Sequence, residues 1–281
     1  GLLSDHQFGF LPGRSTVDLL LSTTQTWSDA VDRSSEVRVV ALDISRAFDR
    51  VWHRGLQQKL IACGLRGHLL KWITSFLSER KQRVVISGQT SALRPVNAGV
   101  PQGSVLGPTL FLLFINDIFE QVTSSLDLYA DDSTLHCIIE SKQDRARAAD
   151  RLNRDLQCLA QWAESWCIQF NAKKTKVLTV SHARDAGAHP SLSFQGHQLA
   201  EQTLRAIDGE NCTLGGMCKI LKFDNILQFW YFRYENTTGA LRFSLPLFVC
   251  QRQSNKDLAK GEKIWYKCTE FFKYLVDFCK N

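Results

Sequence analysis

Two apolar segments that run into aspartates constrain the fold of this chain more than any other feature. Residues 37–42 are rich in β-branched side chains, are predicted to form a buried strand, and are followed directly by Asp43. Residues 126–139 have the pattern of a β-hairpin with Asp131 and Asp132 at its bend. If these strands pair in one sheet, the three carboxylates meet at one edge. Mg²⁺ prefers oxygen ligands, and a two-metal site for phosphoryl transfer needs several carboxylates close together.

The same aspartates also have ordinary structural explanations. An Asp-Asp pair at the bend of a hairpin is common in solvated turns, because the short polar side chain bonds to its own backbone. Asp43 could instead cap a helical turn that begins near residues 45–48. Taken residue by residue, the pattern leaves the catalytic and the structural interpretation open.

Composition places the chain among globular proteins and excludes several other classes. Of the 281 residues, 44% are hydrophobic and 22% are charged, which suits a buried core and argues against bulk disorder. The nine cysteines include no Cys-x-x-Cys pair, so neither a zinc ribbon nor a disulfide framework is indicated. The net charge of +6 permits a polyanionic partner without requiring one. No apolar run is long enough to span a bilayer.

The rest of the pattern mixes helices and hairpins, as in an α+β fold. Apolar residues at helical spacing predict helices between residues 56 and 77 and a long amphipathic helix over 141–166. Residues 82–87 and 91–96 are expected to form a hairpin around Gly88. Further short strands are expected at 175–180 and 192–199.

A loop rich in Pro and Gly, residues 98–108, precedes an apolar helix expected over 109–119. Its turn residues would let the backbone approach a ligand closely at the start of the helix. An ordinary entry into a buried helix is the alternative explanation.

Five motifs in a fixed order carry a resemblance to a known family. They are Gln7-Phe8-Gly9-Phe10, Leu42-Asp43 with Ala47-Phe48-Asp49, Pro101-Gln102-Gly103-Ser104-Val105-Leu106-Gly107-Pro108, Tyr129-Ala130-Asp131-Asp132, and residues 171–175. Together they resemble the reverse transcriptase of non-LTR retrotransposons, and most nearly the Jockey-like LINE elements of arthropods. The resemblance covers about residues 5–200.

The resemblance implies an α+β fold with a reverse-transcriptase palm, an antiparallel sheet backed by helices. Residues 1–36 would be a partial fingers segment, and residues 37–200 the palm, with an inserted fingers-type hairpin at about 82–97. Residues 201–281 hold five of the nine cysteines, are rich in aromatics, and match no known thumb. We expect this tail to be unrelated, through a frameshift or a gene-model junction, and the chain to be a truncated copy.

The resemblance also implies roles for the carboxylates and for one lysine. Asp43, Asp131 and Asp132 would hold two Mg²⁺ ions, for which Mn²⁺ could substitute. Lys174 matches a lysine near the leaving pyrophosphate and could serve as its proton donor. The adjacent Lys173 is a competitor for that role.

Four further residues are expected to contact nucleotide or template. Phe48 matches the aromatic that lies under the sugar of the incoming nucleotide, where its ring would exclude a 2′-hydroxyl; packing in the core is the alternative. Gln102 and Gly103 match the loop that contacts template and nucleotide. Arg14 is expected to touch template phosphate or, equally, to be solvated.

The function implied is RNA-directed DNA polymerisation, adding dNTPs to a DNA 3′-OH. The expected partners are an RNA template, a DNA primer or target, and the element RNA in a ribonucleoprotein, with no membrane; the oligomeric state stays open. Such a protein would be intracellular and not secreted, acting in the nucleus for target-primed synthesis and in the cytoplasm for ribonucleoprotein assembly.

The alternatives to an active polymerase are a catalytically inactive nucleic-acid-binding remnant and a fragment that does not fold stably. An RNA-dependent RNA polymerase is disfavoured by Tyr129-Ala130-Asp131-Asp132 and by Phe48.

Overall fold

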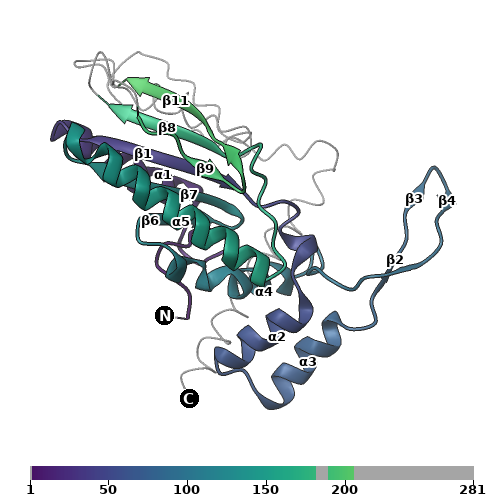
Figure 1. Cartoon of the computed structure of the whole chain (residues 1–281). Helices are drawn as coiled ribbons and strands as arrows, with labels where there is room; N and C mark the ends of the chain where they lie inside the picture. Colours follow the sequence, from purple (N-terminus) through teal and green to yellow (C-terminus); the bar gives the residue numbers. More distant parts are fainter. Residues whose placement is uncertain (1, 182–188, 206–281) are drawn as a thin grey trace, which may run out of the picture.

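The centre of the protein is a five-stranded sheet in the order β11-β8-β1-β7-β6 (Figure 1). The computed structural model describes residues 2–181 and 189–205, so most of the expected tail lies outside the described residues. The strands are β1 (Glu36–Asp43), β6 (Ser125–Tyr129), β7 (Asp132–Ile139), β8 (Lys176–Ser181) and β11 (Ala200–Arg205). β1 is central and buried along nearly its whole length, which explains its run of valines.

The pairing of β1 with β7 confirms that the two acidic segments share one sheet. The strands are antiparallel, with Asp43 opposite Asp132. In the tight hairpin that joins β6 to β7, Tyr129 is also opposite Asp132, so Ala130 and Asp131 form the turn. The last residue of β1 and the first residue of β7 therefore lie at the same end of the sheet.

The expected α+β fold, a sheet backed by helices, is confirmed, and the sheet departs from the antiparallel pattern only at the β11 edge of the described residues. In the order β6, β7, β1 and β8 each strand is antiparallel to its neighbour, but β11 pairs with β8 in parallel. Parallel neighbours need a crossover connection, and here that connection contains a small hairpin of β9 (Ser193–Phe194) and β10 (His197–Gln198). The sheet continues to Arg205, past the boundary expected near residue 200.

Helices cover both faces of the sheet, because side chains alternate between the faces along each strand. On one face, α1 (Thr16–Asp32) packs through Trp27 and Val31 against the odd-numbered valines of β1. On the other face, α4 (Leu106–Ile115) and α5 (Arg145–Ser165) form the larger core. α2 (His53–Ala62) and α3 (Gly67–Leu77) extend that core beyond the sheet.

Two expected helices have different ends in the structure. The helix expected over 109–119 begins at Leu106 and passes at Asn116 into the 3-10 helix η2 (Asn116–Gln121). The helix expected over 141–166 is α5, preceded by the short η3 (Lys142–Asp144). Within the described residues, no helix is both long and apolar enough to cross a membrane.

A hairpin arm projects from the body between α3 and the loop before α4 (Figure 1). It consists of two short ladders, β2 (Lys81–Gln82) with β5 (Arg94–Pro95), and β3 (Val85–Ile86) with β4 (Gln89–Thr90). Ser87 and Gly88 form its tip with φ values of 49° and 80°, the two positive values that a two-residue I′ turn requires. The arm lies where the sequence predicts a hairpin.

Candidate active site

Three carboxylates lie together at the end of the sheet where β1 ends and β7 begins. Directly opposed residues of an antiparallel pair point to the same face, so the side chains of Asp43 and Asp132 share the face that α1 covers further along. Asp131 follows from the turn. All three side chains are half-buried, and that of Asp43 is 20% exposed. The structure thus brings together the three aspartates that the sequence singles out.

The electrostatics of this edge disfavour ionised carboxylates. Burial raises the pKa of Asp132 to about 7, and the charges of Asp131 and Asp43 add to the shift. Burial also raises the pKa of Asp131, again with a contribution from Asp43. Within the described part of the chain, no basic side chain forms an ion pair with Asp131 or Asp132, whereas Lys174 approaches Asp43.

These residues fit a hard divalent cation. They offer only oxygen donors, and a bound cation would offset both the burial and the repulsion that raise the pKa of Asp131 and Asp132. In residues 2–181 and 189–205, no group of three or more His, Cys, Asp or Glu side chains already stands in the arrangement of a metal centre. The fit therefore rests on the chemistry and the electrostatics of the carboxylates.

The segment before β8 is hydrogen-bonded to the backbone on either side of Ile44, next to Asp43. The backbone N–H of Asn171 donates to the Asp43 carbonyl at 2.8 Å, and Ser45 N–H donates to the Gln169 carbonyl at 2.7 Å. These bonds place Lys174 Nζ 3.8 Å from Asp43 Oδ2, with the lysine side chain 57% exposed. Among the described residues, the ion pair to Asp43 comes from Lys174 and not from Lys173.

Phe48 lies at the start of the short 3-10 helix η1 (Phe48–Arg50), close in sequence to Asp43. Its half-buried ring stacks on Phe111 of α4, with centroids 4.6 Å apart, and meets Phe10 edge-on at 6.0 Å. Both interpretations of Phe48 therefore have a structural basis: one face packs on the core, and the side chain keeps an exposed part.

The Pro- and Gly-rich loop is tied to the segment that follows β1. Val100 N–H donates to the Phe48 carbonyl at 2.8 Å, and the Gln102 side-chain amide donates to Asp49 Oδ1 at 2.9 Å. Gly103 is exposed with φ +76°, and a Cβ there would meet open space. Gln102 and Gly103 therefore lie on the exposed surface of a loop anchored beside Phe48.

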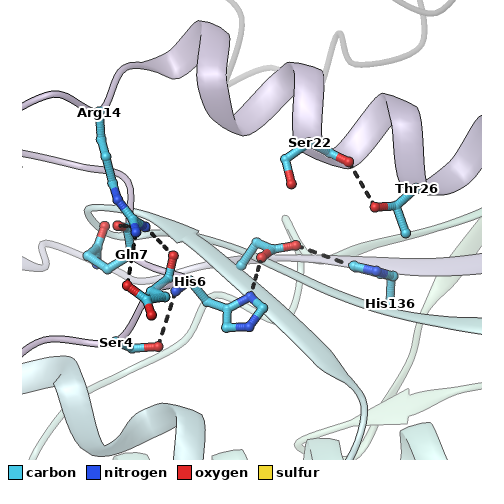
Figure 2. A network of polar contacts seen from close by, with 9 residues as sticks. Ser4, His6, Gln7, Arg14, Ser22, Thr26 and His136 are labelled. Carbon is cyan, nitrogen blue, oxygen red and sulfur yellow. Dashed lines mark hydrogen bonds and ion pairs between the residues drawn. The ribbon is translucent and has the colours of Figure 1, made fainter. Parts of the chain in front are cut away.

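Arg14 is engaged with its own loop. Figure 2 shows its guanidinium turned back towards Gln7, and Nη1 donates to the Gln7 carbonyl at 3.1 Å. Nη2 pairs with Asp5 Oδ1 at 3.0 Å, and the guanidinium lies 5.0 Å from the centroid of the Phe8 ring. These contacts give Arg14 a role in folding residues 5–14, and its contact with template phosphate stays a prediction.

Gln7 is the residue at this site to which the sequence assigns no role. Its side chain is buried, and Oε1 accepts hydrogen bonds from the backbone N–H groups of Gly9 at 2.7 Å and Ala130 at 3.0 Å. A polar residue at the head of the apolar motif Gln7-Phe8-Gly9-Phe10 is a signal in the sequence. Its partner in the carboxylate turn, 123 residues away, could not be identified from that signal.

Comparison with known proteins agrees with this arrangement. Residues 1–200 match the family described as Reverse transcriptase (RNA-dependent DNA polymerase). The RNA-directed DNA polymerase from mobile element jockey of Drosophila melanogaster is 35% identical over 201 residues, 69% of this chain and 21% of that protein. The probable RNA-directed DNA polymerase from transposon BS, also of Drosophila melanogaster, is 36% identical over 185 residues, 62% of this chain and 20% of that protein.

Among solved structures, apo telomerase from Candida tropicalis aligns with a TM-score of 0.45 and 14% identity, covering 69% of this chain and 39% of that one. At that score the likeness supports no statement about function. The chain spans about a fifth of the length of the curated relatives it matches. The resemblance to Jockey-like non-LTR elements is confirmed, and the chain belongs to the reverse transcriptase family.

Proposed function

We propose that this chain is the RNA-directed DNA polymerase domain of a non-LTR retrotransposon, adding dNTPs to a DNA 3′-OH along an RNA template. The observation that carries the proposal is the pairing of Asp43 with Asp132, which puts three carboxylates at one edge of the sheet within the segment that matches the family. Burial, and after it the charges of the neighbouring carboxylates, raise the pKa of Asp131 and Asp132, and divalent cations would favour the ionised forms.

Asp43, Asp131 and Asp132 would hold two Mg²⁺ ions, or Mn²⁺ in their place. Such ions, when bound, activate the attacking hydroxyl and stabilise the leaving pyrophosphate. The chain contributes a fixed geometry: β1 and β7 hold two of the carboxylates opposite each other through backbone hydrogen bonds. Because burial raises the pKa of Asp132 to about 7, protons would compete with the cation for this carboxylate below that pH.

Lys174 is the residue best placed to donate a proton to the leaving pyrophosphate. Its ammonium lies 3.8 Å from Asp43 Oδ2, and the side chain is exposed, so it could reorient towards a bound pyrophosphate. A positioned acid of this kind lowers the barrier to the departure of a charged leaving group.

Phe48, Gln102 and Gly103 would surround the incoming nucleotide. The Phe48 ring is held in place by Phe111 and Phe10, so it could exclude a 2′-hydroxyl without moving. Gln102 and Gly103 lie on the exposed loop beside it, where template and nucleotide could be contacted through side chain and backbone.

The partners that follow are an RNA template, a DNA primer or target, and the element RNA as a ribonucleoprotein. Synthesis primed on a chromosomal target would take place in the nucleus, and assembly with the element RNA in the cytoplasm. We further propose that residues 37–200 form the palm and residues 1–36 part of the fingers. The support is the match of residues 1–200 to the reverse transcriptase family.

Incorporation of dTTP on poly(rA)/oligo(dT) by the 281-residue chain, with Mg²⁺ or Mn²⁺, tests the proposal. Asp131→Asn should lower the rate on the order of 1000-fold or more, because it removes a metal ligand. Asp150→Asn, on the exposed side of α5, is the matched control and should leave the rate unchanged. Binding of RNA that weakens with salt, without any incorporation, would instead identify a non-catalytic nucleic-acid-binding remnant.

Phe48→Val tests the assignment of sugar selection. Shortening the ring should raise the use of rUTP relative to dTTP by about 10- to 100-fold, because it opens space for the 2′-hydroxyl. Phe76→Val on α3 is a control that changes an aromatic away from the site. An unchanged ratio of rUTP to dTTP in Phe48→Val would assign the ring to core packing alone.

A further inference from the structure

The loop that contains the first motif lies directly against the edge of the sheet at the carboxylate turn. Residues 6–8 run parallel to β6: Phe8 N–H donates to the Leu128 carbonyl at 2.8 Å, and Leu128 N–H donates to the His6 carbonyl at 2.9 Å. Gln7 is thereby held beside the last residues of β6. Its side chain reaches the turn that follows.

The turn itself has a backbone conformation that needs support. Ala130 has φ +58°, in the left-handed region that residues with a Cβ rarely adopt. Its N–H donates to Gln7 Oε1, at 3.0 Å, and this acceptor is buried away from water. Asp131 follows immediately, so the direction of its carboxylate depends on how Ala130 is held.

The loop also lies too close to the turn for a side chain at residue 9. A Cβ at Gly9 would lie 2.3 Å from the backbone nitrogen of Ala130, so only glycine fits this approach. The second hydrogen bond of Gln7 Oε1, from Gly9 N–H, fixes the same contact from the side of the loop. Arg14 in turn holds the loop by donating to the Gln7 carbonyl (Figure 2).

We propose that Gln7 is a positioning residue for the proposed polymerase reaction. Through one side-chain oxygen it joins the loop to the carboxylate turn and so sets the orientation of Asp131. Gln7 does not touch substrate; it acts through the Ala130 amide. The inference rests on the proposed function, since it assigns Asp131 to metal binding.

Gln7→Met tests this role, because methionine preserves the length of the side chain and removes the acceptor. Mn²⁺ is the probe, and its affinity for the full chain is measured by electron paramagnetic resonance. We expect the affinity to fall about 10-fold, as for other residues that orient a metal ligand. Gln7→Glu keeps an acceptor oxygen and should recover most of the lost affinity. Gln58→Met, on the exposed side of α2, should change nothing.

Hydrogen exchange gives a second readout that requires no metal. In the parent chain, the Ala130 amide should exchange slowly, and in Gln7→Met it should exchange at least about 10-fold faster, because it loses its acceptor. Trp27→Phe, in the separate core under α1, controls for a general loss of stability. It should lower the melting temperature without accelerating exchange at Ala130 or weakening Mn²⁺ binding.

The outcomes separate the two proposals. If Asp131→Asn abolishes Mn²⁺ binding while Gln7→Met leaves both affinity and exchange unchanged, the positioning role is overturned and the metal site stands. If Asp131→Asn leaves Mn²⁺ binding unchanged, the metal assignment fails, and the positioning role fails with it.

Discussion

The two ends of strand β1 each carry a carboxylate, and the protein treats them in opposite ways. At its first residue, Glu36 is buried and receives the Arg145 Nε–H at 2.9 Å and the Ser181 hydroxyl at 3.1 Å. At its last residue, Asp43 faces Asp132 across the ladder. The first end is neutralised by a buried ion pair. At the last end Lys174 pairs with Asp43 through an exposed side chain, and Asp131 and Asp132 add two more carboxylates beside it.

The pKa values record this difference. Burial alone would raise the pKa of Glu36, but the hydrogen bonds and charge of Arg145 outweigh it and hold the pKa below its usual range. Burial and neighbouring carboxylates instead raise the pKa of Asp132 to about 7. The buried ion pair stabilises the ionised form of Glu36 in the fold, whereas an ionised Asp132 destabilises the fold unless a cation balances its charge.

Breaking the neutralised end should have the largest effect on stability. Glu36→Gln breaks the buried ion pair between Glu36 and Arg145, and we expect the free energy of unfolding to fall by about 3–5 kcal/mol. Urea denaturation at pH 7 measures the change. Glu140→Gln, at an exposed site just after β7, is the control and should be nearly neutral. A loss below about 1 kcal/mol in Glu36→Gln would mean that the pair contributes little.

Removing a carboxylate at the other end of β1 should instead raise the free energy of unfolding. In metal-free buffer at pH 8, Asp132→Asn should raise the free energy of unfolding by on the order of 2–4 kcal/mol, because it removes a carboxylate whose folded pKa of about 7 lies above its ordinary 3.8. A raised pKa favours folding at low pH, and this benefit is lost as pH rises towards 7. The gain from the substitution should therefore vanish near pH 4. A destabilised Asp132→Asn at pH 8 would contradict the comparison.

Lys174 and Arg145 offer a third contrast, between an exposed cation and a buried one. Lys174→Met should lower kcat by about 100-fold, as expected for loss of a proton donor. Its free energy of unfolding should change by less than about 1 kcal/mol, because the pair with Asp43 is largely solvated. Lys173→Met is the matched control in both assays. Equal effects of the two substitutions on kcat would remove the assignment of Lys174.

The smallest expected effect is on the pH dependence of metal affinity. Protons compete with Mg²⁺ for Asp132, so the affinity should fall up to about 10-fold for each pH unit below about 7 and level off above it. Calorimetric titration of the metal-free chain between pH 5.5 and 8.5 would show the inflection. Affinity independent of pH over this range would exclude Asp132 as a ligand.

Local patterns in the sequence were sufficient to predict the acidic end of the sheet. The valines before Asp43 identify a buried strand, and Asp131 and Asp132 at a hairpin bend identify a turn, so their convergence required only that the strands pair. The hairpin arm around Gly88 is predictable for the same reason, because its turn chemistry is local.

What could not be predicted depends on contacts between distant segments. Arg38 lies within an apolar strand yet is fully buried, because Glu201 and the Pro190 carbonyl accept its hydrogen bonds. The parallel pairing of β11 with β8 depends on a crossover that no local pattern specifies. The support that Gln7 gives to Ala130 likewise becomes visible only when the loop is seen against β6.

Anomalous diffraction from crystals of the 281-residue chain soaked in Mn²⁺ tests the central claim most directly. The claim predicts Mn²⁺ in direct contact with carboxylate oxygens of Asp43, Asp131 and Asp132, and no bound Mn²⁺ at Glu36, where Arg145 already balances the charge. In Asp131→Asn crystals the peaks should weaken or disappear. Mn²⁺ absent from the three aspartates in the parent chain, or unchanged by Asp131→Asn, would contradict it.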